Sequence, residues 1–284
     1  MKILKNELLS KHTTFKIGGA AEYFCSPKSN NELKEALSFA KNNSLKIFII
    51  GNGSNILIPD EGLKGLVIHL KMSKIIISKQ KSTIESGVLL NKLLSVFADN
   101  GLSGLEFMAG IPGSLGGSIC MNSGQGKSSI SKFISKVWAL DYNGEEHIFS
   151  NTQCKFNYRK SIFQKKKLII TKAEFILNKD KADEIKKRIK DLIANKIKRQ
   201  PYDLPSAGSF FKNPKNLFTG QLIESAGLKG LKINGAQISE KHGNFIVNIG
   251  KAKAKDVLKL AEIAKKEVRK KYNISLKPEV ILIK

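Results

Sequence analysis

Arginine is rare in this chain, which makes each arginine informative. The 284 residues include 49 lysines and arginines together, and the only arginines are Arg159, Arg188, Arg199 and Arg269. A guanidinium keeps its charge and binds a planar anion through two parallel N–H groups, which an ammonium cannot do. Because the composition favours lysine so strongly, an arginine that remains indicates a position where bidentate contact with an anion matters.

Two glycine-rich segments indicate where the backbone itself could bind a ligand. Gly51-Asn52-Gly53-Ser54-Asn55 follows the apolar run 46–50, and residues 109–126 contain six glycines and Pro112. Because glycine has no Cβ, successive N–H groups can converge on an anion such as a phosphate. A polar turn and a turn-rich surface loop are the alternative interpretations of these two segments.

Neither segment matches a standard nucleotide-binding pattern. GxGxxG would require glycine at Ile56, and the phosphate-loop pattern that ends at Lys127 and Ser128 would require glycine at Met121. The cysteines and histidines show no metal-ligand spacing, so the sequence predicts neither a disulfide framework nor a metal site. They are Cys25, Cys120, Cys154, His12, His69, His147 and His242.

The elements that carry these residues form a mixed α+β pattern without internal repeats. Apolar spacing predicts helices over 30–43, 89–100 and 180–198. The buried stripe of the last helix is expected to be Ile185, Ile189, Leu192, Ile193 and Ile197. Strands are expected at 46–50, 66–70, 74–78, 82–86, 168–177 and 280–283, on both sides of Asn143-Gly144, and as a pair over 13–24 turned at Gly18-Gly19.

Charge and composition limit the possible protein classes. Hydrophobic residues make up 41% and charged residues 26%, which excludes disordered, collagen-like and coiled-coil chains. No run approaches 18 apolar residues, and the start has no apolar core of signal-peptide length, so we expect a cytoplasmic protein without membrane partners. The net charge of +25 favours anionic partners, although a solvated lysine-rich surface explains most of it.

Six segments in order resemble the UDP-N-acetylenolpyruvoylglucosamine reductase family. They are TTFKIGGAAEYF, GNGSNILIPDEGLKGLVI, GLEFMAGIPGSLGGSICMNSG, YRKSIF, PSAGSFFKNP and GAQISEKHGNFIVN, and the resemblance spans residues 12–283. It implies an FAD-binding module of the vanillyl-alcohol-oxidase type over 1–195, with two subdomains that divide near 70–80, and a smaller α+β substrate-binding domain over 196–284. The coarse prediction of a break near 180–200 agrees with this division.

The family reduces the enolpyruvyl double bond of UDP-N-acetylglucosamine enolpyruvate to give UDP-N-acetylmuramate, a precursor of bacterial peptidoglycan. The resemblance therefore implies a UDP-N-acetylmuramate dehydrogenase with noncovalent FAD and with NADPH as hydride donor. It also implies residues at the cofactor: Thr14, Gly51, Asn52, Gly53, Ser54, Asn55, Gly110, Pro112, Gly113, Ser114, Gly116, Gly117, Ile119 and Lys196.

Three catalytic residues follow from the same resemblance. Arg159 would hold the substrate carboxylate as charge builds on it, Ser209 matches the family's proton donor, and Glu279 matches its third catalytic residue. Substrate contacts are expected from Tyr158, Lys212, Asn213 and His242. A surface ion pair, a turn serine, a solvent-facing glutamate and a structural histidine are the alternative interpretations of Arg159, Ser209, Glu279 and His242.

The chain departs from the family pattern in two places and indicates one subtype. The usual NAGAYG reads Asn122-Ser123-Gly124-Gln125-Gly126, without the tyrosine, and Lys196 stands where the family often has an arginine near FAD. Only 49 residues separate Arg159 from Ser209, which resembles the shorter subtype without an inserted tyrosine loop.

Two other functions remain open from the sequence. An FAD-dependent sugar or alcohol oxidase would share the fold class, and a basic nucleic-acid-binding protein would account for the charge. The second is disfavoured because the lysines are spread along the chain and no nucleic-acid-binding motif occurs. We therefore expect a UDP-sugar and NADPH as partners, no nucleic acid, and a monomer.

Overall fold

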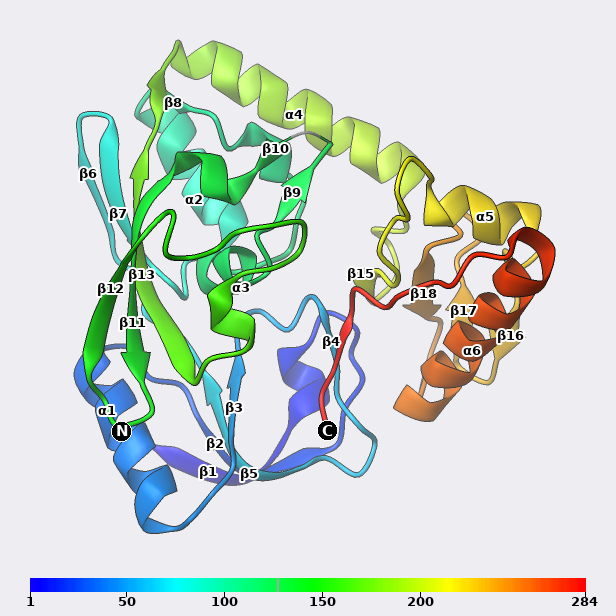
Figure 1. Cartoon of the computed structure of the whole chain (residues 1–284), viewed down its shortest axis with the longest axis horizontal. Coiled ribbons are helices and arrows are strands. Elements are labelled where there is room, and N and C mark those ends of the chain that lie inside the picture. Colours follow the sequence, from blue (N-terminus) through cyan, green and yellow to red (C-terminus); the bar gives the residue numbers. More distant parts are fainter. Residues whose placement is uncertain (127) are drawn as a thin grey trace. The chain divides into compact units, whose positions relative to one another are not determined.

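The computed structural model describes residues 1–126 and 128–284, so Lys127 of the rejected phosphate-loop pattern lies outside the described residues. The chain forms two compact units (Figure 1). The first comprises Met1–Lys5, Tyr23–Asn52 and Lys64–Asn195, and the second comprises Asn6–Glu22, Gly53–Leu63 and Lys196–Lys284.

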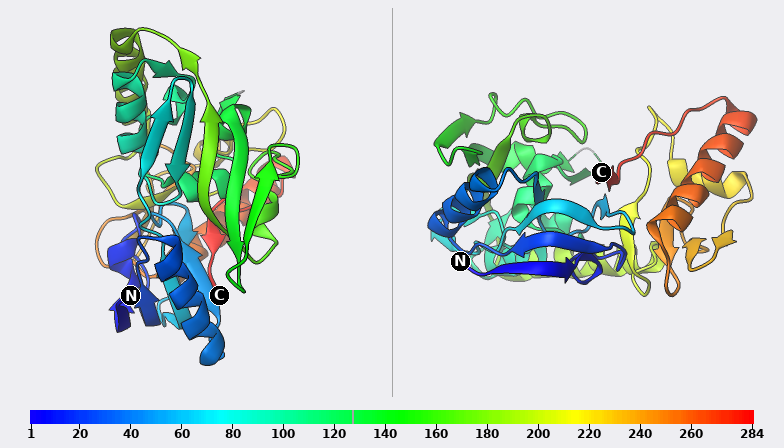
Figure 2. Two further views of the ribbon diagram at one scale, coloured as in Figure 1. Left: turned by 90° about the vertical axis from the view of Figure 1, so that its left-hand side faces the viewer. Right: turned by 90° about the horizontal axis from the view of Figure 1, so that it is seen from below.

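The larger core of the first unit lies on a five-stranded antiparallel sheet in the order β12-β11-β13-β7-β6. Figure 2 shows these strands side by side in its left view. Helix α2 (Leu90–Asp99) places Leu93, Leu94 and Phe97 in the core cluster that includes residues of this sheet. The strand bounds are β6 Ile75–Ser78, β7 Lys81–Glu85, β11 Ile134–Asp141, β12 Glu146–Ser150 and β13 Leu168–Ile176.

A second core of the first unit surrounds helix α1 (Asn30–Asn42) and the strands β3 (Ile47–Ile50) and β5 (Leu63–His69). The strand order of this sheet is β1-β2-β5-β3, and β3 pairs with β5 in parallel. The helix begins where sequence rules place it, because the Ser29 hydroxyl accepts the Glu32 N–H at 3.2 Å. The remaining bounds here are β1 Ile3–Leu8 and β2 Ala20–Cys25.

The second unit packs α5 (Thr219–Ser225) and α6 (Ala254–Tyr272) with an antiparallel sheet in the order β15-β18-β17-β16. A short parallel pair, β4 (Ile56–Leu57) with β19 (Ile281–Leu282), belongs to the same unit. Asp60 caps α6 from a distant segment, because its carboxylate accepts the N–H groups of Ala254 at 2.7 Å and Lys255 at 3.2 Å. The sheet bounds are β15 Ser206–Ser209, β16 Lys232–Ile233, β17 Ala236–Ile238 and β18 Phe245–Asn248.

The remaining elements are short, apart from the long helix α4. They are η1 Leu9–His12, β8 Leu102–Ser103, η2 Glu106–Met108, α3 Leu115–Cys120, β9 Gly124–Gln125, β10 Ser128–Ser129, η3 Ile130–Phe133, η4 Ile162–Gln164, β14 Asn178–Lys179 and α4 Ala182–Arg199. In the part of the chain that the structure describes, no helix has the length and apolar character to cross a membrane.

The compact units differ from the contiguous ranges 1–195 and 196–284 that the sequence predicts. Segments 6–22 and 53–63 cluster with 196–284, because long-range backbone bonds hold them there. The Ile281 N–H donates to the Asn55 carbonyl at 2.9 Å, and the Asn248 amide donates to the Phe15 carbonyl at 3.2 Å.

Three local predictions are wrong for identifiable reasons. Residues 13–17 form no strand, because Lys16 has a φ of +57° and the Thr13 hydroxyl donates to the Ile17 carbonyl across a tight turn. The alternative interpretation of residues 109–126 as a turn-rich surface loop is wrong, because they include the short helix α3. Ile197 is 47% exposed while its neighbour Lys196 is 8% exposed, so the buried side of α4 turns away from the expected stripe in its last turn.

Candidate active site

Within the first unit, Gly51 and Asn52 of the first glycine-rich segment lie against the second segment. The Asn52 side-chain amide donates to the Pro112 carbonyl at 2.7 Å. A Cβ at Gly51 would overlap the hydroxyl of Ser114, so the backbone at Gly51 passes directly over the start of α3. The contact requires glycine at this position, and it brings residues 51–52 and 112–117 into one surface, as both segments would need for one ligand.

The segment that follows β7, residues 86–88, bonds to the start of α3 and carries a buried hydroxyl. The N–H groups of Leu115 and Gly116 donate to the carbonyls of Val88 and Ser86, both at 2.8 Å. A Cβ at Gly116 would lie 2.8 Å from the Ser86 Cβ, so the two backbones are in close contact. Ser86 is 1% exposed, and its hydroxyl has no hydrogen-bond partner among the described residues.

These features fit a flavin cofactor. An unsatisfied buried hydroxyl costs free energy unless a ligand or water completes it, and the flat ring and pyrophosphate of FAD need close backbone approach. Sequence reasoning missed Ser86, although a serine directly before Gly87, at the end of a predicted strand, was an available signal. Gly110 has a φ of +78°, which favours glycine, whereas the Ile119 side chain is fully buried in the core cluster.

Arg159 lies in a tight turn that is hydrogen-bonded to the end of the second glycine segment. Its Nη2 donates to the Gly124 carbonyl at 3.0 Å, and its guanidinium lies 5.1 Å from the ring centre of Tyr158. The Asn122 amide donates to the Asn157 carbonyl at 3.0 Å, which fixes the turn from the other side. Tyr158 is 50% exposed. A bidentate carboxylate contact needs two parallel N–H donors of this guanidinium, and that contact stays a prediction.

Ser209 and Glu279 come together in the second unit through the backbone. Ser209 ends β15, opposite Phe245, and the next residue, Phe210, accepts the Glu279 N–H at 2.8 Å. The Glu279 carbonyl accepts the Asn55 side-chain amide at 3.2 Å. A serine, a half-buried glutamate and an amide from the first glycine segment therefore occupy one neighbourhood.

Thr14 joins the same neighbourhood. Its hydroxyl donates to the Ser206 carbonyl at 2.7 Å, and its N–H donates to the Gly53 carbonyl at 3.2 Å. Gly53 has a φ of +64°, and a Cβ there would overlap the His12 carbonyl. Glycine is therefore required at 53 for the fold of this turn as well as for any ligand. Ser54 is partly exposed beside it.

Lys212 and Asn213 lie in the loop before α5, and the loop uses their polar backbone and side-chain atoms. The Asn213 side-chain oxygen accepts the Thr219 N–H at 3.0 Å, and the Lys212 carbonyl accepts the Thr219 hydroxyl at 2.9 Å. The Lys212 N–H donates to the carbonyl of Lys277 at 2.9 Å, and Lys277 lies two residues before Glu279. The loop is thus tied to the segment that carries Glu279.

His242 is packed as a turn residue in the second unit. Its Nδ1 accepts the Asn244 N–H at 3.1 Å, and its ring lies 4.9 Å from the ring of Phe245. Burial lowers the pKa of His242, so the imidazole is neutral at pH 7 and carries its proton on Nε2. Contact with substrate through Nε2 stays a prediction.

Lys196 is buried near the end of α4, and desolvation lowers its pKa to about 8. The family resemblance places Lys196 at the cofactor, and this role stays a prediction.

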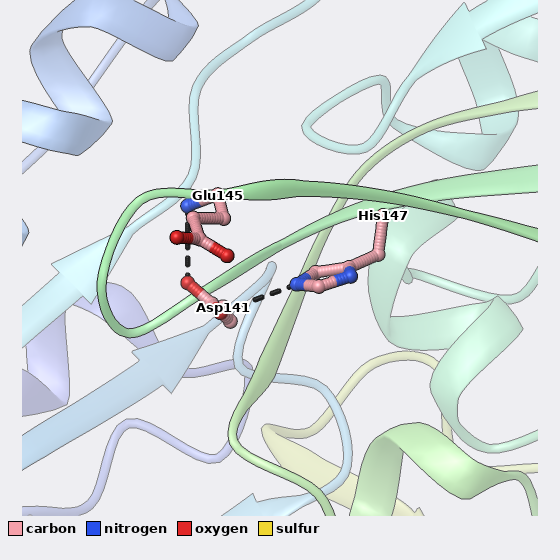
Figure 3. Close-up of side chains that lie close together, drawn as sticks. All are labelled: Asp141, Glu145 and His147. Carbon is pink, nitrogen blue, oxygen red and sulfur yellow. Dashed lines mark hydrogen bonds and ion pairs between the residues drawn. The ribbon is translucent and has the colours of Figure 1, made fainter.

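One cluster of carboxylates and a histidine has the composition of a metal site, but its contacts stabilise a hairpin (Figure 3). Asp141 accepts the Glu145 N–H at 3.0 Å and lies 3.2 Å from His147 Nε2, between β11 and β12. The backbone N–H of Glu145 and the side chain of His147 lower the pKa of Asp141. We assign no metal to this cluster, because these contacts account for its geometry.

Comparison with known proteins identifies the family. A family model described as the UDP-N-acetylenolpyruvoylglucosamine reductase C-terminal domain matches residues 200–283, and one described as an FAD binding domain matches residues 21–150. The chain is 41% identical over 283 residues to the reductase of that name from Caldanaerobacter subterraneus, covering 99% of this chain and 94% of the relative. The chain belongs to the UDP-N-acetylenolpyruvoylglucosamine reductase family.

Two further relatives support this membership of the reductase family. The enzyme of the same name from Clostridium novyi is 40% identical and covers 99% of this chain and 92% of its own length. The crystal structure of the Thermus caldophilus reductase superimposes with a TM-score of 0.83 at 32% identity and covers 100% of this chain and 98% of its own. The predicted α+β fold with an FAD-binding module is confirmed, and the oxidase and nucleic-acid alternatives are not favoured.

Proposed function

We propose that this protein reduces the enolpyruvyl group of UDP-N-acetylglucosamine enolpyruvate to UDP-N-acetylmuramate, with FAD as cofactor and NADPH as reductant. The observation that carries this proposal is the second-unit frame in which Glu279 is bonded to the backbone beside Ser209 and to Asn55 of the first glycine segment. It supplies an acid and a hydroxyl beside the segment assigned to the cofactor. The activity belongs to peptidoglycan precursor synthesis, and hence to cell-wall formation, cell shape and cell division.

The residues have distinct roles in this proposal. When bound, FAD supplies the redox group that passes two electrons from NADPH to the double bond. Arg159 holds the substrate carboxylate and stabilises the enediolate that forms as electrons arrive. Ser209 delivers a proton to the neighbouring carbon, and Glu279 donates a hydrogen bond or a proton in the same reaction. Tyr158, Lys212, Asn213 and His242 contact the nucleotide sugar.

The cofactor site combines both glycine-rich segments. Gly51 to Asn55 would hold the pyrophosphate of FAD, and the residues from Gly110 to Ile119 would line the flavin. In this proposal the hydroxyl of Ser86 would find its hydrogen-bond partner in the cofactor, and Thr14 and Lys196 would also contact the cofactor. In this assignment segment 1–195 serves mainly FAD and segment 196–284 serves the substrate.

A visible absorbance spectrum of the purified protein followed by a turnover assay tests this function. We expect a flavin spectrum, release of all flavin into the supernatant on acid precipitation, and NADPH oxidation that depends on the enolpyruvyl nucleotide sugar. NADPH oxidation that depends instead on oxygen and a simple sugar would contradict the proposal. The proposal includes that the protein acts as a monomer in the bacterial cytoplasm. Light scattering of the purified protein should therefore give the mass of one chain.

The role of Ser209 predicts a defect in product formation. Ser209→Ala should lower kcat on the order of 10²-fold to 10⁴-fold, the range for a lost general acid. Loss of flavin colour on adding NADPH should stay normal, because it needs no proton on the substrate carbon. Ser206→Ala, on the same strand, is the matched control. Normal product formation in Ser209→Ala would show that this serine is only a turn residue.

A further inference from the structure

Phe218 exposes an aromatic ring where the fold gives no reason for one. It is 64% exposed, the largest fraction of any exposed large hydrophobic side chain among the described residues. The adjacent Leu217 is 42% exposed. Phenylalanine is among the residues most often buried, because removing its side chain from water is favourable by about 1.5–3 kcal/mol of free energy. The ring therefore remains available for an apolar or aromatic ligand.

Phe218 lies in a loop whose backbone is held by hydrogen bonds. The next residue, Thr219, is 0% exposed, and its hydroxyl and N–H donate to Lys212 and Asn213 at 2.9 and 3.0 Å. The Leu217 N–H donates to the Pro214 carbonyl at 3.2 Å. These bonds close the loop 212–219 on itself, so the backbone that carries Phe218 is held in one conformation and its ring loses little freedom on binding.

The same loop carries positive charge without acidic neighbours in the sequence. Lys212 and Lys215 lie in it, and no aspartate or glutamate occurs between Asp203 and Glu224. A nucleotide presents a planar base together with phosphates. An exposed ring on a loop that also carries two lysines is complementary to both parts, because bases stack on aromatic side chains and phosphates pair with lysine.

We propose that Phe218 stacks on the base of a bound nucleotide while the lysines of its loop face the phosphates. This inference rests on the proposed function, which brings two nucleotides to the protein, the UDP-sugar and NADPH. The uracil and the adenine share the chemistry that the ring recognises, and the experiment separates them.

Titration calorimetry with UDP and, separately, with NADP⁺ tests the proposal on the flavin-bound protein. Phe218→Ala should raise Kd for one of the two nucleotides on the order of tenfold, which corresponds to about 1.4 kcal/mol and to one base stacked on one aromatic ring. Phe218→Tyr should restore affinity, because it keeps the π-face. A loss confined to UDP assigns the ring to uracil, and a loss confined to NADP⁺ assigns it to adenine.

Leu258→Ala is the matched control, since Leu258 is an exposed hydrophobic residue of the same unit, on α6. It should leave both Kd values unchanged. Unchanged affinity for both nucleotides in Phe218→Ala, or an equal loss in Leu258→Ala, overturns the inference alone. An unmodified protein that binds neither nucleotide overturns the proposed function and this inference with it.

Discussion

At the scale of single residues, Arg159 tests whether charge or geometry matters at the reacting carboxylate. One of its donors bonds to Gly124 at 3.0 Å, so its guanidinium is already oriented by the protein. Arg159→Lys keeps the charge but removes the two parallel N–H groups. We expect kcat to fall on the order of 10²-fold, as when one oxyanion donor is removed. Steady-state kinetics with a normal kcat would exclude contact with the carboxylate.

Lys196 predicts a pH-dependent stability difference. Lysine in the unfolded chain keeps its proton up to about 10.5, whereas burial lowers the pKa of native Lys196 to about 8. Between these values the unfolded state binds more protons, so the free energy of unfolding rises with pH. Lys196→Met removes this titration. In flavin-free protein the variant should therefore be more stable below about pH 8, and its advantage should shrink as pH rises toward 10.5.

Urea denaturation across this pH range, at constant ionic strength, measures the difference between the two proteins. Lys198→Met, at an exposed position of the same helix, is the matched control. A stability advantage of Lys196→Met that stays constant with pH would contradict the predicted cost of burying this charge.

At the scale of elements, the contact between the segment after β3 and the start of α3 separates fold from cofactor binding. Gly51→Ala would place a methyl group on the Ser114 hydroxyl. The double variant Gly51→Ala with Ser114→Ala removes that overlap, so its melting temperature should recover. Flavin retention after gel filtration should stay low in both variants, because the double variant also lacks the Ser114 hydroxyl that the family resemblance assigns to the cofactor. Recovery of flavin together with stability would show that Gly51 serves packing alone.

At the scale of the whole molecule, the second unit is built from three separate parts of the sequence. Phe15, Ile17 and Leu57 lie in its core and are at most 3% exposed, and Asp60 caps α6. A fragment of residues 196–284 lacks all four. Each missing core side chain is worth about 1.5–3 kcal/mol, and their sum is comparable to the whole stability of a domain, about 5–15 kcal/mol.

We therefore expect the fragment 196–284 to remain unfolded, while the full chain folds. Far-UV circular dichroism and amide dispersion in NMR spectra measure this directly. A fragment that unfolds cooperatively on heating would show that segments 6–22 and 53–63 are accessory to the second unit.

The sequence by itself determined the features that depend on short windows of chain. The helix over 30–43 and the hairpin at Asn143-Gly144 appear as predicted, because apolar spacing, the Ser29 cap and the turn residues act within a few positions. The ordered motifs likewise sufficed to predict the family, whereas the roles that they assign to Arg159, Ser209 and Glu279 stay predictions. Each of these motifs is a short segment whose residues match the family pattern.

Only the tertiary structure decided which distant parts belong together. The Asn55 amide and the Glu279 carbonyl are 224 positions apart, and no local pattern predicts their contact. Helical periodicity predicts that Ile197 is buried, but Ile197 is exposed and the adjacent Lys196 is buried. The hydroxyl of Ser86 is buried without a hydrogen-bond partner among the described residues because α3 packs against it, which no local pattern indicates. Burial and long-range hydrogen bonds depend on the packing of the whole chain, so the neighbourhoods of the candidate site follow from the fold.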